Sequence, residues 1–174
     1  MGQDKALLTP HGIPQAQWAY DLLKPYCEEV VLSCRKGQFD GTPLADLPQA
    51  HDQMEDGGPL QGIRDVMATQ PDAAWLLMAC DLPRVSTEEI EGLLTPAAKE
   101  GCQAVCYLDP ESQLPEPMLA WMAPEFLDHL EAHIATGNRC ARKAFIRLEE
   151  RLDGRQLARP DAMWNMNHPH EVPA

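Results

Sequence analysis

The feature that most constrains the fold is an apolar run, Trp75-Leu76-Leu77-Met78-Ala79-Cys80, which ends abruptly at Asp81-Leu82-Pro83. A short continuous apolar run bounded by turn residues is typical of a strand buried on both faces of a parallel sheet. A second run, Val30-Val31-Leu32, lies within 29–34 and predicts another strand of that kind. Both runs therefore favour a sheet that is covered by helices on its two faces.

Strand-like and helix-like segments alternate along the rest of the chain. Apolar spacing and capping residues predict helices at 14–26, 59–69, from Ser86 onward, 124–135 and 140–152, and further strands at 49–52, 103–108, 117–122 and 162–165. Ser86 with Glu89 three residues later is the pattern of a capping box. We therefore expect an α/β fold, a Rossmann-like three-layer sandwich with a mostly parallel sheet, in one domain spanning residues 1–174.

Charge and composition exclude several classes of function. The formal net charge is -13, and no run of Lys or Arg interrupts the acidic surface, which argues against nucleic-acid binding. No apolar run reaches the roughly 18 residues of a membrane span, and no secretory signal is seen, so we expect no membrane partner. The six cysteines form no CxxC pair, which predicts buried free thiols in a reducing cytoplasm.

Ligands of parallel sheets bind outside the carboxyl ends of the strands, and Asp81 follows the strongest predicted strand there. One interpretation is a cap on the following turn, where Pro83 begins the loop. The other is a Mg²⁺ ligand, because Mg²⁺ needs only one or two protein carboxylates beside phosphates and water. The sequence leaves both open.

Two further positions have a functional and a structural interpretation. Asp52 ends a short predicted strand just before the glycine-rich segment 57–62, whose backbone N–H groups and helix start suit an anion. A tight turn into a helix explains the same residues. Lys5 lies shortly after Gly2 and could neutralise phosphate charge, although a lysine so near a terminus is usually a solvated surface residue.

Other groups of residues that could bind a metal or catalyse a reaction give weaker indications of function. His129 and His133 share a face of a predicted helix, but no third metal ligand is evident, so we do not expect a metal there. The sequence contains no GxSxG, Walker-type or GxGxxG motif.

Six short segments resemble, in the same order, segments of the molybdenum cofactor guanylyltransferases and related nucleotidyltransferases. They are MGQDKALL at 1–8, GPLQGI at 58–63, CDLP at 80–83, QLPEP at 113–117, GNR at 137–139 and NMNHP at 165–169. Each segment is short, but together they span nearly the whole chain. The resemblance implies a nucleotide-diphospho-sugar transferase-like fold and a Mg²⁺-dependent transfer of GMP from GTP to molybdopterin, with release of pyrophosphate.

The resemblance also implies roles for individual residues. Lys5 would contact the phosphates, and Asp81 would hold Mg²⁺ against GTP; these two are the expected catalytic residues. The expected nucleotide and substrate contacts are Lys5, Ser33, Asp52, Gly58, Asp81, Asn165 and Asn167, the last two on the molybdopterin side. Other molybdenum cofactor biosynthesis proteins or molybdoenzymes are further expected partners.

One departure from the family pattern stands out. The family signature begins with an apolar strand and a Leu-Ala-Gly-Gly loop, whereas this sequence begins at the methionine that follows them. We therefore expect a domain truncated at its N-terminus. Two alternatives stay open: a non-catalytic domain of the same fold that binds molybdopterin or a partner, and a cytidylyl-type sister nucleotidyltransferase.

Overall fold

The computed structural model describes residues 4–53, 57–95 and 100–166. In chain order the helices are α1 (Gln15–Leu23), α2 (Gly58–Met67), α3 (Thr87–Leu94), α4 (Phe126–Ala135) and α5 (Ala141–Ile146). The strands are β1 (Leu32–Cys34), β2 (Gln49–His51), β3 (Trp75–Met78), β4 (Ala104–Leu108), β5 (Pro115–Met122) and β6 (Leu152–Arg155). Short 3-10 turns lie at Lys5–Leu7, Lys24–Tyr26 and Glu149–Arg151.

The strands of the described residues form two hydrogen-bonded groups. β1 and β2 pair in parallel, and the second group has the order β3-β5-β4-β6. β5 runs antiparallel to both neighbours and β4 runs parallel to β6, so β3, β4 and β6 share one direction and only β5 is reversed. The predicted α/β fold with strands mostly in one direction is confirmed.

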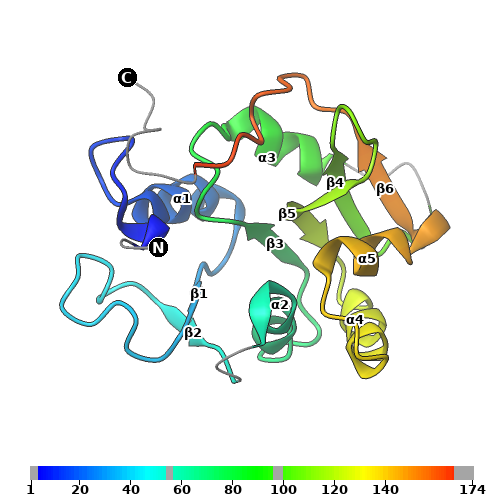
Figure 1. Ribbon diagram of the computed structural model, residues 1–174, viewed down its shortest axis with the longest axis horizontal. Helices are drawn as coiled ribbons and strands as arrows, with labels where there is room; N and C mark the ends of the chain where they lie inside the picture. Colours follow the sequence, from blue (N-terminus) through cyan, green and yellow to red (C-terminus); the bar gives the residue numbers. More distant parts are fainter. Residues whose placement is uncertain (1–3, 54–56, 96–99, 167–174) are drawn as a thin grey trace.

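Helices cover both faces of these strands (Figure 1), with α1 and α3 on one face and α2, α4 and α5 on the other. Successive β3 side chains pack alternately on the two faces. Leu76 and Met78 contact the cluster that contains Leu23 of α1, whereas Trp75 and Leu77 contact the cluster that contains Ile63 of α2. The apolar run that forms β3 thus faces helices on both sides, as predicted. Among the described residues, none of the helices combines the length and the apolar character that a membrane span requires.

The sequence-based boundaries were wrong in three places. The helix expected at 140–152 ends at Ile146, and after a 3-10 turn the chain forms β6, which adds to β4. The strand expected at 162–165 is a turn followed by irregular backbone. The strand expected at 29–34 is reduced to Leu32–Cys34, because only that part pairs with β2.

The predicted capping box at Ser86 is present and is part of a larger ionic network. The Glu89 carboxylate accepts from the Ser86 backbone at 2.8 Å and from Arg159 at 2.5 Å, although Glu89 is only 2% exposed. Burial alone would raise the pKa of Glu89, but the bonds from Arg159 and Ser86 outweigh it and hold the pKa below its usual value. These bonds hold the segment around Arg159 against the start of α3.

We expect Glu89→Gln to destabilise the fold in a pH-dependent way. A lowered folded-state pKa contributes stability above the unfolded pKa of about 4.3, and this contribution is lost as the pH falls through the folded-state pKa. The free energy of unfolding should therefore fall by about 1–2 kcal/mol at pH 7, and the loss should shrink below about pH 4. Urea unfolding at pH 7 and below about pH 4 measures this, with Glu150→Gln at an exposed position as the control. An equal loss in the free energy of unfolding at pH 7 and below about pH 4 would contradict this prediction.

Candidate active site

The first element of the site is an ion pair at the carboxyl end of β3. Asp81 lies in the turn that begins shortly after β3 ends at Met78, and its Oδ2 lies 3.0 Å from Nζ of Lys5, with the two side chains 23% and 25% exposed. Burial also raises the pKa of the neighbouring Cys80 thiol to about 11, so this cysteine stays protonated at neutral pH. The pair is a half-buried, solvent-reachable cation and anion at the edge where parallel sheets bind ligands.

Asp4 and Gln38 hold Lys5 in place. The Asp4 carboxylate caps the Lys5–Leu7 turn by accepting from the Ala6 backbone at 3.0 Å, and it accepts from Nε2 of Gln38 at 2.7 Å. Gln38 belongs to the loop that follows β1, so one carboxylate ties the lysine turn to the carboxyl end of that strand. Sequence reasoning missed both residues, because a contact across 34 positions leaves no spacing signal.

Ser33 and Asp52 form a second polar group, beside the N-terminal half of α2. The Ser33 hydroxyl donates to Oδ1 of Asp52 at 3.4 Å. A Cβ on Gly62 would lie 3.2 Å from Ser33 Oγ and 3.3 Å from Asp52 Oδ1, so the helix backbone closes directly on both side chains. Gly58, the first residue of α2, has a φ of 71°, a conformation that favours glycine. The glycines of 57–62 thus bring α2 close to Asp52.

Asp65 positions the turn that carries Asp52. Its buried carboxylate accepts from the Gln53 backbone at 2.9 Å and from the Gln61 amide at 2.8 Å, and Arg64 pairs with it at 3.0 Å. Burial alone would raise the pKa of Asp65, but these bonds lower it below its usual value. Asp65 therefore stays ionised and anchors the chain just after Asp52; it is a positioning residue that the sequence analysis did not single out.

The chain returns to this edge near its carboxyl-terminal end. The Met166 backbone N–H donates to the carbonyl oxygen of Asp81 at 2.9 Å, which brings Asn165 beside the Lys5–Asp81 pair. Asn167, the other predicted contact on that side, lies outside the described residues.

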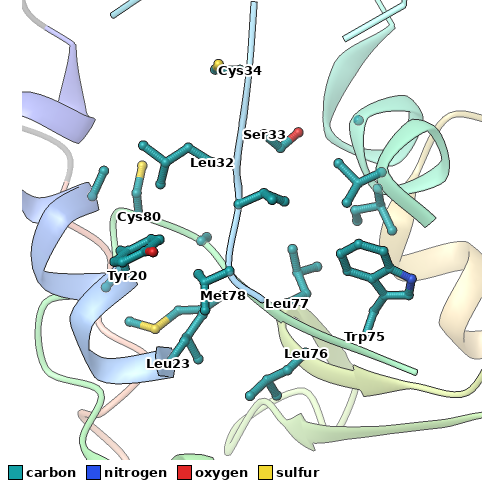
Figure 2. Close-up of a pocket in the computed structure, with 18 of the residues that line it drawn as sticks. Tyr20, Leu23, Leu32, Ser33, Cys34, Trp75, Leu76, Leu77, Met78 and Cys80 are labelled. Carbon is teal, nitrogen blue, oxygen red and sulfur yellow. The ribbon is translucent and has the colours of Figure 1, made fainter. Parts of the chain in front are cut away.

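The described candidate residues all line one cavity of about 1230 Å³: Lys5, Ser33, Asp52, Gly58, Asp81 and Asn165. In Figure 2 the Ser33 hydroxyl points to the α2 side of β1, whereas Cys80 lies on the α1 side, and both residues line the cavity. The remaining walls are mostly apolar and come from α1, α2, β1 and β3. Asp52 and Asp81 therefore open into the same space, as residues of one site must.

The carboxylate of Asp81 is the kind of ligand that suits Mg²⁺. Mg²⁺ takes oxygen ligands, keeps several waters and is usually bound by one or two carboxylates plus substrate phosphates. Asp81 supplies such a carboxylate at the mouth of a space large enough for a nucleotide. No group of three or more His, Cys, Asp or Glu side chains suited to a metal occurs within residues 4–53, 57–95 and 100–166. His129 instead contacts the Ala144 carbonyl at 2.8 Å, in line with the structural interpretation of that histidine.

The α/β fold, with its candidate site at the carboxyl ends of β1 and β3, defines a domain of the nucleotidyltransferase type. A structure titled molybdopterin-guanine dinucleotide biosynthesis protein A, from Archaeoglobus fulgidus, superposes with a TM-score of 0.76 over 98% of this chain and 88% of that one, at 21% identity. A 2-C-methyl-D-erythritol 4-phosphate cytidylyltransferase from Thermus thermophilus gives 0.70 at 11% identity, over 97% and 90% of the two chains. The MobA-like NTP transferase domain matches residues 1–152, so the chain belongs to that family.

Curated relatives are named for molybdenum cofactor synthesis. A molybdenum cofactor biosynthesis bifunctional protein from Synechocystis is 34% identical over 174 residues, and the chain spans 48% of its length. A molybdenum cofactor guanylyltransferase of Pseudomonas putida is 28% identical over 172 residues, which cover 98% of this chain and 87% of the relative. The resemblance found in the sequence is confirmed at the level of the family.

The tight approach of Gly62 gives a prediction in which stability and binding change in opposite directions. Gly62→Ala adds a helix-favouring residue inside α2, which by itself stabilises a helix by about 0.5–1 kcal/mol. The added methyl pushes against Ser33 and Asp52, so we expect GTP affinity to fall about fivefold, roughly 1 kcal/mol, without a lower unfolding midpoint. Isothermal titration and thermal unfolding measure the two effects. Unchanged affinity would show that α2 does not border the nucleotide.

Proposed function

We propose that this domain transfers GMP from GTP to the terminal phosphate of molybdopterin, with Mg²⁺ and with release of pyrophosphate. The observation that carries the proposal is the Lys5–Asp81 pair in a nucleotide-sized cavity that Ser33 and Asp52 also line. Phosphoryl and nucleotidyl transfers need positioning and charge neutralisation more than covalent help from the protein. These residues offer both.

In this proposal the Asp81 carboxylate would hold Mg²⁺. The Lys5 ammonium, which lies 3.0 Å from Asp81, would contact the phosphate oxygens as a compact cation. The metal would supply charge neutralisation at the phosphates. Asp52, held by Ser33 and by the turn that Asp65 anchors, accepts hydrogen bonds from the guanine N–H groups. Gly58 and the start of α2 lie beside the nucleotide.

The acceptor side is assigned to the opposite flank of Asp81. A second cavity of about 260 Å³ is lined by Asp109, Glu116, Asp161, Trp164 and Asn165, among others. Asn165 lines both cavities, so the second cavity adjoins the first at this residue. An aromatic side chain and carboxylates suit a pterin ring with N–H donors, which supports molybdopterin as the acceptor. A cytoplasmic location and contacts with molybdoenzymes stay predictions.

Titration with nucleotides separates this function from the alternatives. We expect GTP with Mg²⁺ to bind at least tenfold more tightly than CTP or ATP, as judged by isothermal titration calorimetry, a difference of about 1.4 kcal/mol or more. A preference for CTP would favour the cytidylyl-type function. Molybdopterin binding without any nucleotide binding would favour the non-catalytic domain and overturn the proposal.

A further inference from the structure

The segment from Asp81 to Arg84, which we call the Asp81 turn, is anchored by the carboxyl-terminal part of the described chain. The Asp81 carbonyl accepts from the Met166 N–H at 2.9 Å, and the Arg84 carbonyl accepts from the Arg159 guanidinium at 3.0 Å. The Leu82 side chain is buried in the core at 1% exposure. None of these contacts involves the segment that carries Lys5.

His11 connects the Asp81 turn to the segment that carries Lys5. Its Nε2 lies 2.9 Å from the carbonyl oxygen of Pro83. Because a carbonyl oxygen only accepts, Nε2 carries a proton and is the donor. From the same segment, the Lys5 ammonium reaches the Asp81 carboxylate at 3.0 Å. The N-terminal segment therefore contacts the Asp81 turn at two points, through one side chain and through one backbone carbonyl.

The loop that carries His11 is closed at its base. The Gln15 N–H donates to the Leu8 carbonyl at 2.7 Å, which joins the two ends of the loop. The Leu8 N–H donates in turn to the Lys5 carbonyl at 3.2 Å, so the loop continues directly from the Lys5–Leu7 turn. These bonds restrict the backbone between Lys5 and His11. A restraint at His11 therefore also restrains the lysine.

The His11 ring is held by an aromatic neighbour. It stacks on the ring of Trp18 in α1, with centroids 4.2 Å apart and 13° between the planes. The stack covers one face of the imidazole and limits the rotamers that would move Nε2 away from Pro83. In Figure 1 the chain that follows β3 passes beside α1 before it enters α3, and Leu23 and Leu82 belong to one apolar cluster. The donor is thus placed by α1, against which the Asp81 turn packs.

Placement of the Asp81 turn matters for the chemistry of the candidate site. A carboxylate that holds a metal and a cation that contacts the same phosphates must be fixed relative to each other, since a shift of about 1 Å can cost about 10²-fold in rate. In the proposed function these two groups belong to Asp81 and Lys5. The bond from His11 to Pro83 links the backbone segments that carry them.

We propose that His11 is a positioning residue, whose bond to the Pro83 carbonyl holds the Asp81 turn at a fixed place relative to Lys5. His11 lines neither of the two cavities, so it acts through the turn and not by touching a substrate. The consequence for the rate of GMP transfer rests on the proposed function. The effect on the order of the Asp81 turn does not.

Two substitutions separate the hydrogen bond from the aromatic stack. His11→Gln keeps an N–H donor with a reach similar to that of Nε2 and removes the ring. His11→Phe keeps a ring against Trp18 and removes the donor. The matched control is His129→Phe on α4, because the His129 ring bonds to the Ala144 carbonyl at 2.8 Å and also packs on an aromatic ring, that of Phe126.

Backbone ¹⁵N relaxation of the nucleotide-free proteins measures the Asp81 turn itself. The amides of Asp81 and Leu82 should have order parameters of about 0.85 in the unsubstituted chain, in His11→Gln and in His129→Phe. In His11→Phe these order parameters should fall toward about 0.6, the upper limit of flexible backbone. Unchanged order parameters in His11→Phe would overturn the proposal, whatever ligand the protein binds.

Initial rates of GMP transfer at saturating Mg²⁺ test the consequence for the reaction. His11→Phe should lower kcat about tenfold and leave KM for GTP within about twofold, whereas His11→Gln and His129→Phe should keep kcat within about twofold. Full kcat in His11→Phe, or equal losses in His11→Phe and either of the other two variants, would overturn the proposal. If the unsubstituted chain transferred no GMP, the proposed function would fail, and the order parameters would still decide whether His11 holds the Asp81 turn.

Discussion

Asp81→Asn should lower the rate of GMP transfer by about 10²- to 10³-fold, which is about 2.7–4 kcal/mol of transition-state stabilisation. The amide keeps the size of the side chain but removes the charge that a hard cation requires. The Lys5–Asp81 ion pair is about a quarter exposed, so its loss should change the free energy of unfolding by no more than about 1 kcal/mol. This variant should therefore lose most of its activity and keep most of its stability.

The matched control is Asp128→Asn, the same chemical change on the exposed face of α4 and away from the cavity. It should leave the rate of transfer unchanged. Initial rates at saturating GTP and Mg²⁺ are compared with those of an unsubstituted chain of the same length. A turnover of Asp81→Asn within about threefold of that chain would remove Asp81 from the metal site.

Lys5→Met should produce the second largest effect, a loss of about 10²-fold in kcat/KM for GTP. Methionine keeps an unbranched apolar stem and removes the ammonium, which in our account neutralises developing charge on the phosphates. Lys5→Arg should recover part of the activity, because the charge is kept while the shape of the donor group changes.

Lys143→Met on α5 is the control for this variant, since Lys143 is exposed and does not line the cavity. Its kcat/KM should equal that of the unsubstituted chain. If Lys5→Met also retained full kcat/KM, Lys5 would be a partner of Asp81 with a purely structural role. A rise in KM alone would instead mean that Lys5 contributes equally to substrate and transition-state binding.

The elements that the sequence predicted are those in which apolar pattern and burial agree. The run from Trp75 to Cys80 predicted a strand, of which Trp75–Met78 is present as β3, and the Ser86 capping box marked the start of α3 by local chemistry alone. β6 was missed because Leu152-Asp153-Gly154-Arg155 carries polar residues and a glycine. It is a strand because Arg155 pairs with Asp153 and bonds to the Gly92 and Thr95 carbonyls, and because β4 supplies a partner. Such tertiary contacts override local propensity.

The residues of the candidate site also fall into those that the sequence predicted and those that it did not. Asp52 and Asp81 were found because each follows a predicted strand, and strand ends converge at one edge of a parallel sheet. Asp4, Gln38 and Asp65 were missed, since each acts through hydrogen bonds to residues that only the folded chain brings near. Gly62 was part of a recognised segment, but its close contact with Ser33 and Asp52 depends on how α2 docks.

The central claim is that a metal-bound triphosphate lies at the edge formed by Lys5, Ser33, Asp52 and Asp81. Paramagnetic broadening by Mn²⁺ in the presence of GTP measures this directly in the ¹⁵N-labelled protein. The account predicts that amide signals of Lys5 and Asp81 broaden first, then those near Ser33 and Gly62, while α4 and α5 stay sharp. Broadening centred on another part of the protein, or none at saturating GTP, would contradict it.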